Sequence, residues 1–469
     1  MLLPDYEKAR KRTKNEVLKE EYVQDRELEL IGKGRLYFIK TYGCQMNEHD
    51  TENIKAMLES VGFCETDIMN QADLVMLNTC SIRENAHNKA FGMLGRIKHL
   101  KETNKDLIVG ICGCMAQEEG VVSKLLDKFK WVNFVMGTHN IHRLPVILNK
   151  AINDKWLEVE VLSVEGNIVE NIPVKRDNKY RAYVNIIYGC DKFCTYCIVP
   201  MTRGKQRSRD PRDIIKEVEE LVVEGYKEVT LLGQNVNAYG KDLGIDYGME
   251  NLLEDVAKTN IPRIKFVTSH PWDFTLEMID VIAKNENIMP YIHLPIQSGS
   301  NKILKAMNRK YKKEDYLTLV NNLREKIPNV SVSTDIIVGF PGETKEDFLE
   351  TINVYHEVKY DFAYTFIFSK RKGTLADDLE DLTPEIEKEE RLQTLNKIVN
   401  SYALESNKKL EDKVESVLVE GDSEKSGYLF GYTKNMKLVN FMGSTDLVGK
   451  IVNIKIIKAK SFSLDGELC

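Results

Sequence analysis

The sequence contains no apolar run of the length that a bilayer-spanning helix requires. Residues 1–29 are charged and lack the apolar core of a secretory signal. An excess of basic residues is also absent, because the net charge is −6 at pH 7. We therefore expect a cytoplasmic protein with no membrane partner and no general affinity for nucleic acid, so that any RNA binding must depend on local basic patches.

Chain length and cysteine content narrow the class further. A chain of 469 residues with 42% hydrophobic and 29% charged residues has the composition of a globular protein with about two to four domains. A cytoplasmic protein is not expected to hold structural disulfides. The nine cysteines are therefore interpreted as metal ligands or free thiols.

Three cysteines lie within eight residues, directly after an apolar strand predicted at 183–188. Cys190, Cys194 and Cys197 form the pattern C-x-x-x-C-x-x-C. Thiolates suit zinc or iron–sulfur clusters, but a structural zinc site needs four ligands and no fourth Cys or His is near. Three thiolates on a four-iron cluster leave one iron open to another ligand. The alternative is three cysteines packed as small apolar residues, which this close spacing disfavours.

Three further cysteines, Cys44, Cys80 and Cys114, each follow a strand-like run. The runs are residues 35–40, 72–77 and 107–111. Helical patterns at 50–61 and 85–101 separate them, which predicts a parallel sheet with helices on both faces. Ligands bind beyond the carboxyl ends of the strands in such sheets, so we expect these three thiolates to converge and leave a fourth position open.

The remaining cysteines give weaker signals. Cys112 competes with Cys114, but it lies one step nearer the strand itself, so we favour Cys114. Cys64 follows the helix-ending Gly62 and is interpreted as structural, and Cys469 is expected to have no role. Single cysteines at strand ends are common, so the spaced trio is by itself less specific than the compact one.

The segment from residue 181 onward repeats a strand-plus-helix unit six times. The predicted strands are residues 181–188, 228–232, 264–268, 291–295, 330–338 and 362–368. Six such units make an open barrel, three-quarters of a complete eightfold one, with chemistry at its C-terminal mouth. Polar residues follow several of these strands or lie within them, among them Gln234, Ser269, Gln297 and Asp335.

The chain therefore predicts an α/β protein that ends in a small all-β module. We expect a charged extension over 1–33, a Rossmann-like parallel-sheet domain over 34–150, a linker over 151–178, an open (β/α)6 partial TIM barrel over 179–405, and a small β-barrel over 408–469. The last segment shows short alternating strands with glycine breaks, which we place at 414–420, 428–433, 437–441 and 447–458.

Two groups of basic residues are candidates for RNA binding. Arg203, Lys205, Arg207 and Arg209 are four cations within seven residues directly after the compact trio, a pattern suited to clamping phosphate or carboxylate groups. The alternative is a solvated basic loop. In the C-terminal module, the candidate phosphate contacts are Lys434 and Lys437.

The compact trio resembles the signature of radical S-adenosylmethionine (SAM) enzymes, in which C-x-x-x-C-x-x-C follows the first strand. In that family the open iron of a [4Fe–4S] cluster binds SAM, and reductive cleavage gives a 5′-deoxyadenosyl radical. The resemblance implies such a cluster on Cys190, Cys194 and Cys197. It also implies SAM contacts at Gln234, Ser269, Gln297, Arg309 and Asp335.

The spaced trio resembles the N-terminal domain of the methylthiotransferases through Thr41-Tyr-Gly-Cys-Gln-Met-Asn47, Asn78-Thr-Cys-Ser-Ile-Arg83 and Gly113-Cys-Met-Ala-Gln117. In that domain three cysteines hold an auxiliary [4Fe–4S] cluster, which implies this role for Cys44, Cys80 and Cys114. By the same analogy, Asn47 and Arg83 lie beside the cluster. The C-terminal module resembles the TRAM domain, a small RNA-binding barrel.

Within this family, the sequence motifs around Cys44 and Cys80 resemble those of the branch that methylthiolates C2 of N6-dimethylallyladenosine (isopentenyladenosine) at tRNA position 37. The resemblance implies two SAM per product, one to methylate sulfur on the auxiliary cluster and one to give the radical. It implies as partners a tRNA anticodon stem-loop, an electron donor such as flavodoxin or ferredoxin, and a cluster or sulfur donor, with the protein acting as a monomer. The alternatives are a threonylcarbamoyladenosine or ribosomal-protein substrate, or a non-catalytic iron–sulfur RNA-binding protein.

Overall fold

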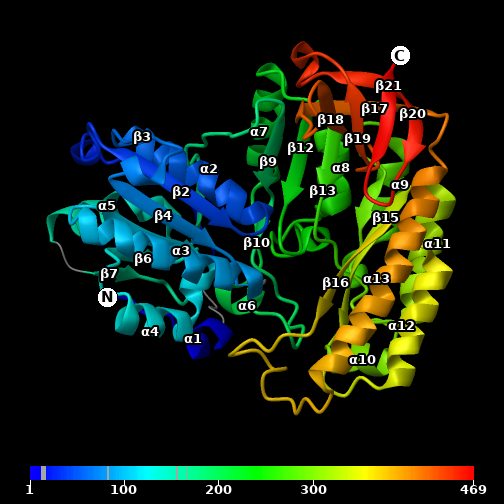
Figure 1. Ribbon diagram of the computed structural model, residues 1–469, viewed down its shortest axis with the longest axis horizontal. Coiled ribbons are helices and arrows are strands. Elements are labelled where there is room, and N and C mark those ends of the chain that lie inside the picture. Colours follow the sequence, from blue (N-terminus) through cyan, green and yellow to red (C-terminus); the bar gives the residue numbers. More distant parts are fainter. Residues whose placement is uncertain (12–16, 82–83, 155–156, 165) are drawn as a thin grey trace.

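The computed structural model describes residues 1–11, 17–81, 84–154, 157–164 and 166–469, so Arg83 lies outside the described residues. Three folded units follow one another along the chain (Figure 1): an α/β domain in blue and cyan, a central α/β domain in green and yellow, and a small red barrel packed on the central domain. No helix in these ranges is both long enough and apolar enough to cross a bilayer.

The N-terminal domain is built on a six-stranded parallel sheet in the order β3-β2-β4-β5-β6-β7. The strands are β2 Leu36–Tyr42, β3 Cys64–Glu65, β4 Leu74–Thr79, β5 Ile108–Gly113, β6 Phe134–Met136 and β7 Glu158–Glu160. The helices are α2 Gln45–Ser60, α3 Glu84–Thr103, α4 Glu119–Lys128 and α5 Leu144–Asn153. Along β4, Leu74 and Met76 enter one core while Val75 and Leu77 enter the other, so both faces of the sheet are covered.

The predicted parallel sheet with helices on both faces is thus confirmed, but helix α2 begins earlier than residue 50. Cys44 occupies its N-cap in an extended conformation, and the helix starts at Gln45. This first turn is mostly polar in sequence and carries no apolar periodicity. Its residues Met46 and Asn47 are nevertheless buried, and Asn47 faces the end of β4, where its Nδ2 donates to Asn78 Oδ1 at 3.0 Å.

The central domain contains the six expected strands, hydrogen-bonded as two parallel sheets in the orders β13-β12-β9 and β14-β15-β16. The strands are β9 Arg181–Asn185, β12 Glu228–Leu232, β13 Arg263–Phe266, β14 Tyr291–His293, β15 Ser331–Val338 and β16 Phe362–Ile367. An isolated parallel bridge between Ile264 and Ile288 joins the two halves. Together they form the predicted open barrel.

Helices cover the outside of this barrel (Figure 1). They are α7 Pro211–Val223, α8 Met249–Lys258, α9 Leu276–Lys284, α10 Asn301–Ala306, α11 Lys313–Lys326, α12 Lys345–Val358 and α13 Glu385–Lys408. Helix α7 has the predicted signals: the Asp210 side chain accepts a hydrogen bond from the backbone N–H of Arg212 at 2.8 Å, and Pro211 is the first helical residue. The apolar faces of these helices and the strands share one large core.

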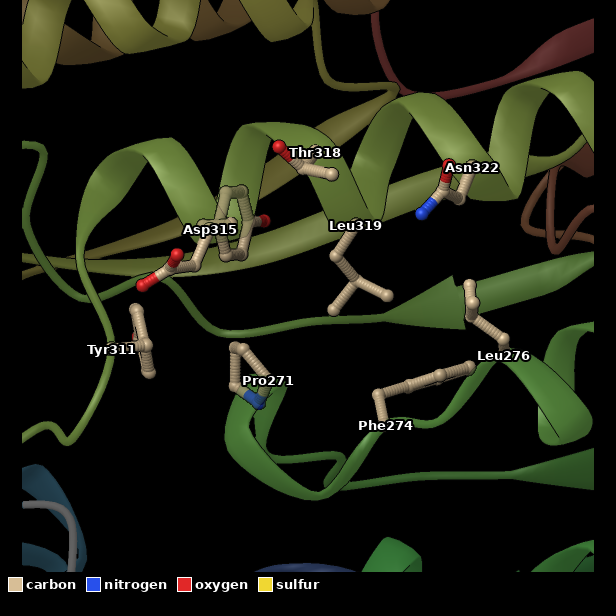
Figure 2. Close-up of a pocket in the computed structure, with 9 residues that line it drawn as sticks. Pro271, Phe274, Leu276, Tyr311, Asp315, Thr318, Leu319 and Asn322 are labelled. Carbon is tan, nitrogen blue, oxygen red and sulfur yellow. The ribbon is translucent and has the colours of Figure 1, made fainter.

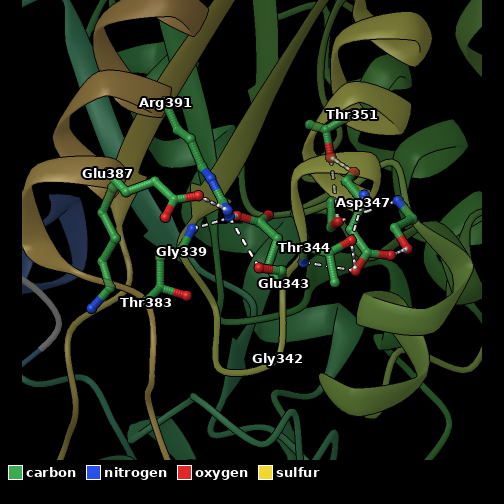
Figure 3. Close-up of polar contacts among 12 residues, drawn as sticks. Gly339, Gly342, Glu343, Thr344, Asp347, Thr351, Thr383, Glu387 and Arg391 are labelled. Carbon is green, nitrogen blue, oxygen red and sulfur yellow. Dashed lines mark hydrogen bonds and ion pairs between the residues drawn. The ribbon is translucent and has the colours of Figure 1, made fainter.

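A tight turn after β15 anchors the last helix, α13, on the barrel. Glu343 Oε2 accepts hydrogen bonds from the backbone N–H of Gly339 at 2.7 Å and from Arg391 Nη1 at 2.6 Å (Figure 3). Burial raises the pKa of Glu343, while these two donors oppose that shift. Gly339 has φ +70°, and a Cβ there would lie 2.5 Å from Lys388 Cγ, so both the backbone and the close approach require glycine.

The C-terminal module is a closed barrel in the order β17-β18-β19-β21-β20, as the all-β prediction required. Its strands are β17 Val414–Asp422, β18 Tyr428–Thr433, β19 Leu438–Met442, β20 Ile451–Ala459 and β21 Leu464–Leu468. Four strands were predicted. The fifth, β21, was missed because the short run 464–468 is mostly polar, yet it pairs with both β19 and β20 and so closes the barrel.

Short elements join the units. Strand β1 Lys19–Glu21 pairs in parallel with β8 Ile168–Glu170, and β10 Ile187–Tyr188 pairs antiparallel with β11 Arg207–Ser208. Helix α1 Tyr6–Lys11 packs on the short helix α6 Val199–Thr202 through Tyr6, Ala9, Ile198 and Met201. The described parts of the extension and of the linker thus lie against the folded domains.

Candidate iron–sulfur and SAM site

The compact cysteine trio lies on a loop closed by the β10–β11 pair. Gly189 has φ +68°, and a Cβ there would lie 2.0 Å from the carbonyl oxygen of Lys205, so only glycine permits this approach. The backbone N–H of Cys190 donates to the carbonyl of Gly204 at 3.1 Å. The loop therefore returns on itself and holds Cys190 close to the segment that follows the trio.

The three thiols of this loop lie together in a buried environment. Burial raises the pKa of Cys190 to about 12, and burial followed by the neighbouring Cys194 and Cys190 raises that of Cys197. Arg309 Nη1 donates to Cys194 Sγ at 3.6 Å. A bound cation would offset the cost of ionising these buried thiols, so the site suits a metal better than a free thiolate.

The spaced trio also converges, at the carboxyl ends of β2, β4 and β5. Cys44 follows β2, Cys80 follows β4 and Cys114 opens a 3-10 turn after β5. A hydrogen bond with Cys80 lowers the pKa of Cys44 to about 6, with a further contribution from the Arg203 charge. Burial raises the pKa of Cys114, on which Arg203 and Cys44 also act. The electrostatic contacts among these groups place the three sulfur atoms in one cluster.

Side-chain amides fix the loops around this second trio. Cys44 Sγ donates to Asn47 Oδ1 at 3.4 Å, and Asn78 Nδ2 donates to the backbone carbonyl of Asn47 at 2.8 Å. Gly113 has φ +90°, and a Cβ there would lie 2.5 Å from the carbonyl oxygen of Thr79. Cys112 points away from the trio into the apolar core that α2 and α5 share with the sheet, which is where its earlier position on the strand puts it.

Arg203 and Gly204 connect the two trios. Arg203 Nε donates to Cys114 Sγ at 3.1 Å, and its Nη2 lies 2.6 Å from Asp50 Oδ2 on α2. The next residue, Gly204, accepts the hydrogen bond from Cys190 described above. Two consecutive residues of one chain segment therefore touch both cysteine trios.

The donor sets fit iron–sulfur clusters. Among the described residues, no three His, Cys, Asp or Glu side chains are arranged to hold a single metal ion. In a cluster each cysteine binds a different iron, and three cysteine sulfurs are donors of the kind that such a cluster uses.

Buried polar atoms without protein partners mark the mouth of the barrel near the compact trio. Gln234 Oε1 and Asn235 Oδ1 follow β12, and Ser269 Oγ follows β13; within the described part of the chain none of the three has a hydrogen-bond partner. A buried polar atom without a partner costs about 1–3 kcal/mol, so these atoms fit a polar ligand such as SAM.

The other predicted SAM contacts are placed differently. Gln297 has φ +73°, in the left-handed region, and its backbone N–H donates to the carbonyl of Asp335 at 2.9 Å. The Asp335 carboxylate lies 3.4 Å from His293 Nε2. Arg309 is buried and donates to the carbonyl of Pro295 at 2.8 Å as well as to Cys194. Arg309 therefore contacts the proposed cluster ligand directly.

Sequence reasoning missed a charged cluster beneath the cysteine loop. The buried carboxylate of Asp273 lies 3.0 Å from Lys192 Nζ and 2.5 Å from Lys241 Nζ, and it accepts a hydrogen bond from Asn235 Nδ2 at 2.7 Å. Lys192 lies inside the C-x-x-x-C motif, so this cluster ties the loop to the barrel. These residues come from separate loops, and no local pattern connects them.

The predicted phosphate clamp does not fit the burial of its residues. Arg203, Arg207 and Arg209 are only 5–8% exposed. Arg207 donates to the carbonyl of Gly166 at 2.9 Å, and Arg209 pairs with the buried carboxylate of Glu170 at 2.6 Å. Lys205 is half-buried. Each of these buried guanidinium groups pairs with a protein acceptor that lies far away in the sequence. They therefore hold separate segments of the chain together inside the fold.

The two lysines predicted to bind RNA in the C-terminal barrel also make protein contacts. Lys434 Nζ donates to the carbonyl of Glu286 at 2.9 Å, and Lys437 Nζ lies 3.2 Å from Asp361 Oδ1. Both acceptors belong to the central domain. The loop between β18 and β19 thus docks the small barrel on the central barrel, while RNA contact by these two half-buried lysines stays a prediction.

A separate pocket of about 220 Å³ lies between the turn at Pro271 and helix α11, on the helical side of the barrel (Figure 2). Its lining includes Phe274, Leu276, Tyr311 and Leu319 and no cysteine. Tyr311, which lines the pocket, accepts a hydrogen bond from Arg309 Nε at 3.0 Å. The pocket is therefore next to Arg309, the residue that contacts Cys194.

Comparisons with known proteins match all three units. Residues 184–354 match the radical SAM superfamily, residues 36–137 match the uncharacterized protein family UPF0004, and residues 408–469 match the TRAM domain. A radical S-adenosylmethionine methyltransferase, TsrM, from Kitasatospora setae shares the fold, with a TM-score of 0.53 and 14% identity over 73% of this chain and 77% of that one.

Full-length relatives share the sequence as well. A protein of Staphylococcus epidermidis is 54% identical over 99% of this chain and 91% of its own length, one of Geobacillus kaustophilus is 53% identical over 100% and 88%, and one of Bacillus subtilis is 52% identical over 99% and 92%. Each is named tRNA-2-methylthio-N(6)-dimethylallyladenosine synthase. The chain therefore belongs to the family of tRNA-2-methylthio-N(6)-dimethylallyladenosine synthases, which are radical SAM enzymes.

Proposed function

We propose that this protein transfers a methylthio group to C2 of N6-dimethylallyladenosine at position 37 of tRNA, beside the anticodon. The observation that carries the proposal is the contact of Arg203 and Gly204 with both cysteine trios. A base placed between the trios is within reach of both, as a sulfur donor and a radical source require. The names of relatives that match across the whole chain supply the substrate.

Membership of the radical SAM superfamily implies SAM and a [4Fe–4S] cluster. We assign this cluster to Cys190, Cys194 and Cys197, and a second, auxiliary cluster to Cys44, Cys80 and Cys114. The aromatic C2–H bond is strong and unactivated, so the bound cofactors supply the radical chemistry, with two SAM consumed per product.

The side chains of the protein hold and orient these groups. Gln234 and Ser269 place unpartnered buried oxygens where a polar ligand would accept or donate hydrogen bonds. Arg309 and Arg203 each donate to one thiol. Lys192 of the cysteine loop contacts Asp273 and so fixes the loop on the barrel. Together they keep the reacting centre rigid and limit its exposure to water.

We propose that the substrate is the anticodon stem-loop of tRNA, bound with the help of the C-terminal barrel. A loop base is accessible, so extruding it into the site costs little. The required electron donor is of the flavodoxin or ferredoxin kind, and a further donor must replace the sulfur that leaves. The protein is proposed to act as a monomer in the cytoplasm.

Mass spectrometry of tRNA nucleosides from a deletion strain tests this function. We expect N6-dimethylallyladenosine to accumulate without its 2-methylthio derivative, and the wild-type gene to restore the derivative. Loss of methylthiolated threonylcarbamoyladenosine, or of a modified ribosomal protein, would transfer the activity to another substrate. Binding of tRNA without SAM turnover would favour a non-catalytic iron–sulfur RNA-binding protein.

A further inference from the structure

Arg203 is a buried cation whose position is set by both halves of the proposed active centre. The residue is 5% exposed, and its ion-pair partner Asp50 is 4% exposed. A guanidinium stays charged at all physiological pH values, and a buried charge is tolerated only when it is paired. The guanidinium divides its donors between the Asp50 carboxylate and the sulfur of Cys114.

The backbone around Arg203 leaves its side chain little freedom. Its N–H donates to the carbonyl of Val199 at 2.8 Å, which closes the turn of α6. The preceding carbonyl, that of Thr202, accepts a hydrogen bond from Thr138 Oγ1 of the N-terminal domain at 2.6 Å. The following carbonyl, that of Gly204, accepts the hydrogen bond from Cys190. The charge is therefore fixed relative to Cys114 and Cys190 together.

Two charges of opposite sign lie beside Cys114. Arg203 Nε donates to its sulfur at 3.1 Å, and the Asp50 carboxylate lies 2.6 Å from Nη2 of the same guanidinium. Arg309, beside the compact trio, instead donates to the hydroxyl of Tyr311 and to the carbonyl of Pro295. The pairing of Arg203 with a carboxylate is thus a feature of the auxiliary site, and it sets the net charge beside that trio.

We propose that Arg203 is a positioning residue for the auxiliary cluster, which holds one positive charge against Cys114 and ties that cluster to the Cys190 loop. The inference rests on the proposed function, because it requires a cluster on Cys44, Cys80 and Cys114. Hydrogen bonds and charge near the sulfur ligands set the reduction potential of iron–sulfur clusters. A cation beside the ligand stabilises the reduced, more negative cluster, and the Asp50 carboxylate offsets part of that effect.

The test uses the full-length chain with Cys190, Cys194 and Cys197 replaced by Ala, so that only the auxiliary cluster gives a signal. The protein is reconstituted anaerobically with iron and sulfide, and its midpoint potential is measured by redox titration with electron paramagnetic resonance. Arg203→Gln should shift the potential to more negative values, and Asp50→Asn should shift it to more positive values. Arg203→Lys keeps the charge and should remain closest to the parent protein.

Midpoint potentials that shift in opposite directions indicate an effect of charge and not of lost structure. Arg203→Gln and Asp50→Asn break the same ion pair, but they remove charges of opposite sign. A merely structural role would move both potentials in the same direction or leave both unchanged, and either result overturns the inference. Arg209→Gln is the matched control, since Arg209 is an equally buried guanidinium whose carboxylate partners are Glu170 and Glu217. Its removal should leave the potential unchanged.

Two outcomes distinguish this inference from the proposed function. If the parent protein takes up no iron on the auxiliary trio, the second cluster of the proposed function fails and the inference fails with it. If it takes up iron but the potentials do not respond to Arg203 and Asp50, only the inference fails. Should Arg203→Gln not fold, the positive shift expected of Asp50→Asn still decides the question.

Discussion

The two cysteine trios present similar chemistry through opposite architectures. Each has three thiols and one buried arginine that donates to a sulfur, at 3.1 Å from Arg203 to Cys114 and at 3.6 Å from Arg309 to Cys194. One trio comes from a single loop, whereas the other is assembled from three strand ends. The same kind of site can therefore be specified by local spacing or by sheet topology.

The two trios differ in their electrostatics. The pKa of Cys44 is lowered to about 6 by its hydrogen bond with Cys80 and by Arg203, whereas burial raises that of Cys190 to about 12. Ionisation is therefore favoured at Cys44 of the spaced trio and costly at Cys190 of the compact one. This difference suits two distinct tasks, and it can be tested at each trio separately.

The largest expected effect is at the compact trio. Cys194→Ala should reduce 5′-deoxyadenosine formation by more than about 100-fold, because groups that only support a metal ligand already cost about 10–100-fold when removed. The measurement is chromatography of SAM cleavage products under reducing conditions. Undiminished cleavage in this variant would show that Cys194 does not hold the cluster that binds SAM.

Cys80→Ala should have a different effect, because it removes a ligand of the spaced trio only. We expect SAM cleavage to remain within a few-fold of wild type, since Cys190, Cys194 and Cys197 are intact, while the methylthio product is lost. The two products are quantified in the same reaction with tRNA. A normal yield of methylthiolated nucleoside would refute the auxiliary site.

Thiol reactivity of the metal-free protein should reflect the electrostatic difference. At pH 7 the Cys44 thiol, whose pKa is lowered by its hydrogen bond with Cys80, is ionised to a larger extent than the Cys190 thiol, whose pKa is raised by burial. Iodoacetamide should therefore label Cys44 about 10-fold faster than Cys190 or more, and the rate at Cys44 should fall as the pH is lowered. Peptide mass spectrometry gives both rates, with the exposed Cys64 as the internal reference; equal rates at Cys44 and Cys190 would contradict the assignment.

The smallest effect is expected at Cys112. Its side chain packs in an apolar core, so Cys112→Ala should lower stability by about 1 kcal/mol and leave the iron content unchanged. Cys114→Ala, two residues later, is the matched variant and should lose the auxiliary cluster. Thermal unfolding and iron quantification of both proteins measure the contrast, and loss of iron in Cys112→Ala would reverse the choice between them.

The sequence predicted the fold well where local patterns decide it. The alternation of strands and helices indicated both α/β domains, and the helix signals at Asp210 and Pro211 matched α7. Strand β21 was missed because its residues are polar and its pairing partners are distant. The start of α2 was missed because its first turn is buried by contacts with β4 that no sequence periodicity records.

The two cysteine trios could be predicted to different degrees, according to how close their residues lie to one another in the sequence. The compact trio follows from spacing alone, and the spaced trio follows once strand ends are placed side by side. The role of the arginines did not follow, because Arg203 and Arg209 look like part of a phosphate clamp until their acceptors Asp50 and Glu170 are known. These acceptors lie on other elements, so burial and pairing become visible only in the folded chain.

Iron content of anaerobically reconstituted protein tests the central claim most directly. If each trio holds one four-iron cluster, the wild-type chain should bind about eight irons, and the two variants with either trio replaced by Ala should each bind about four. A wild-type chain with about four irons, or with zinc in their place, would contradict the account of two clusters.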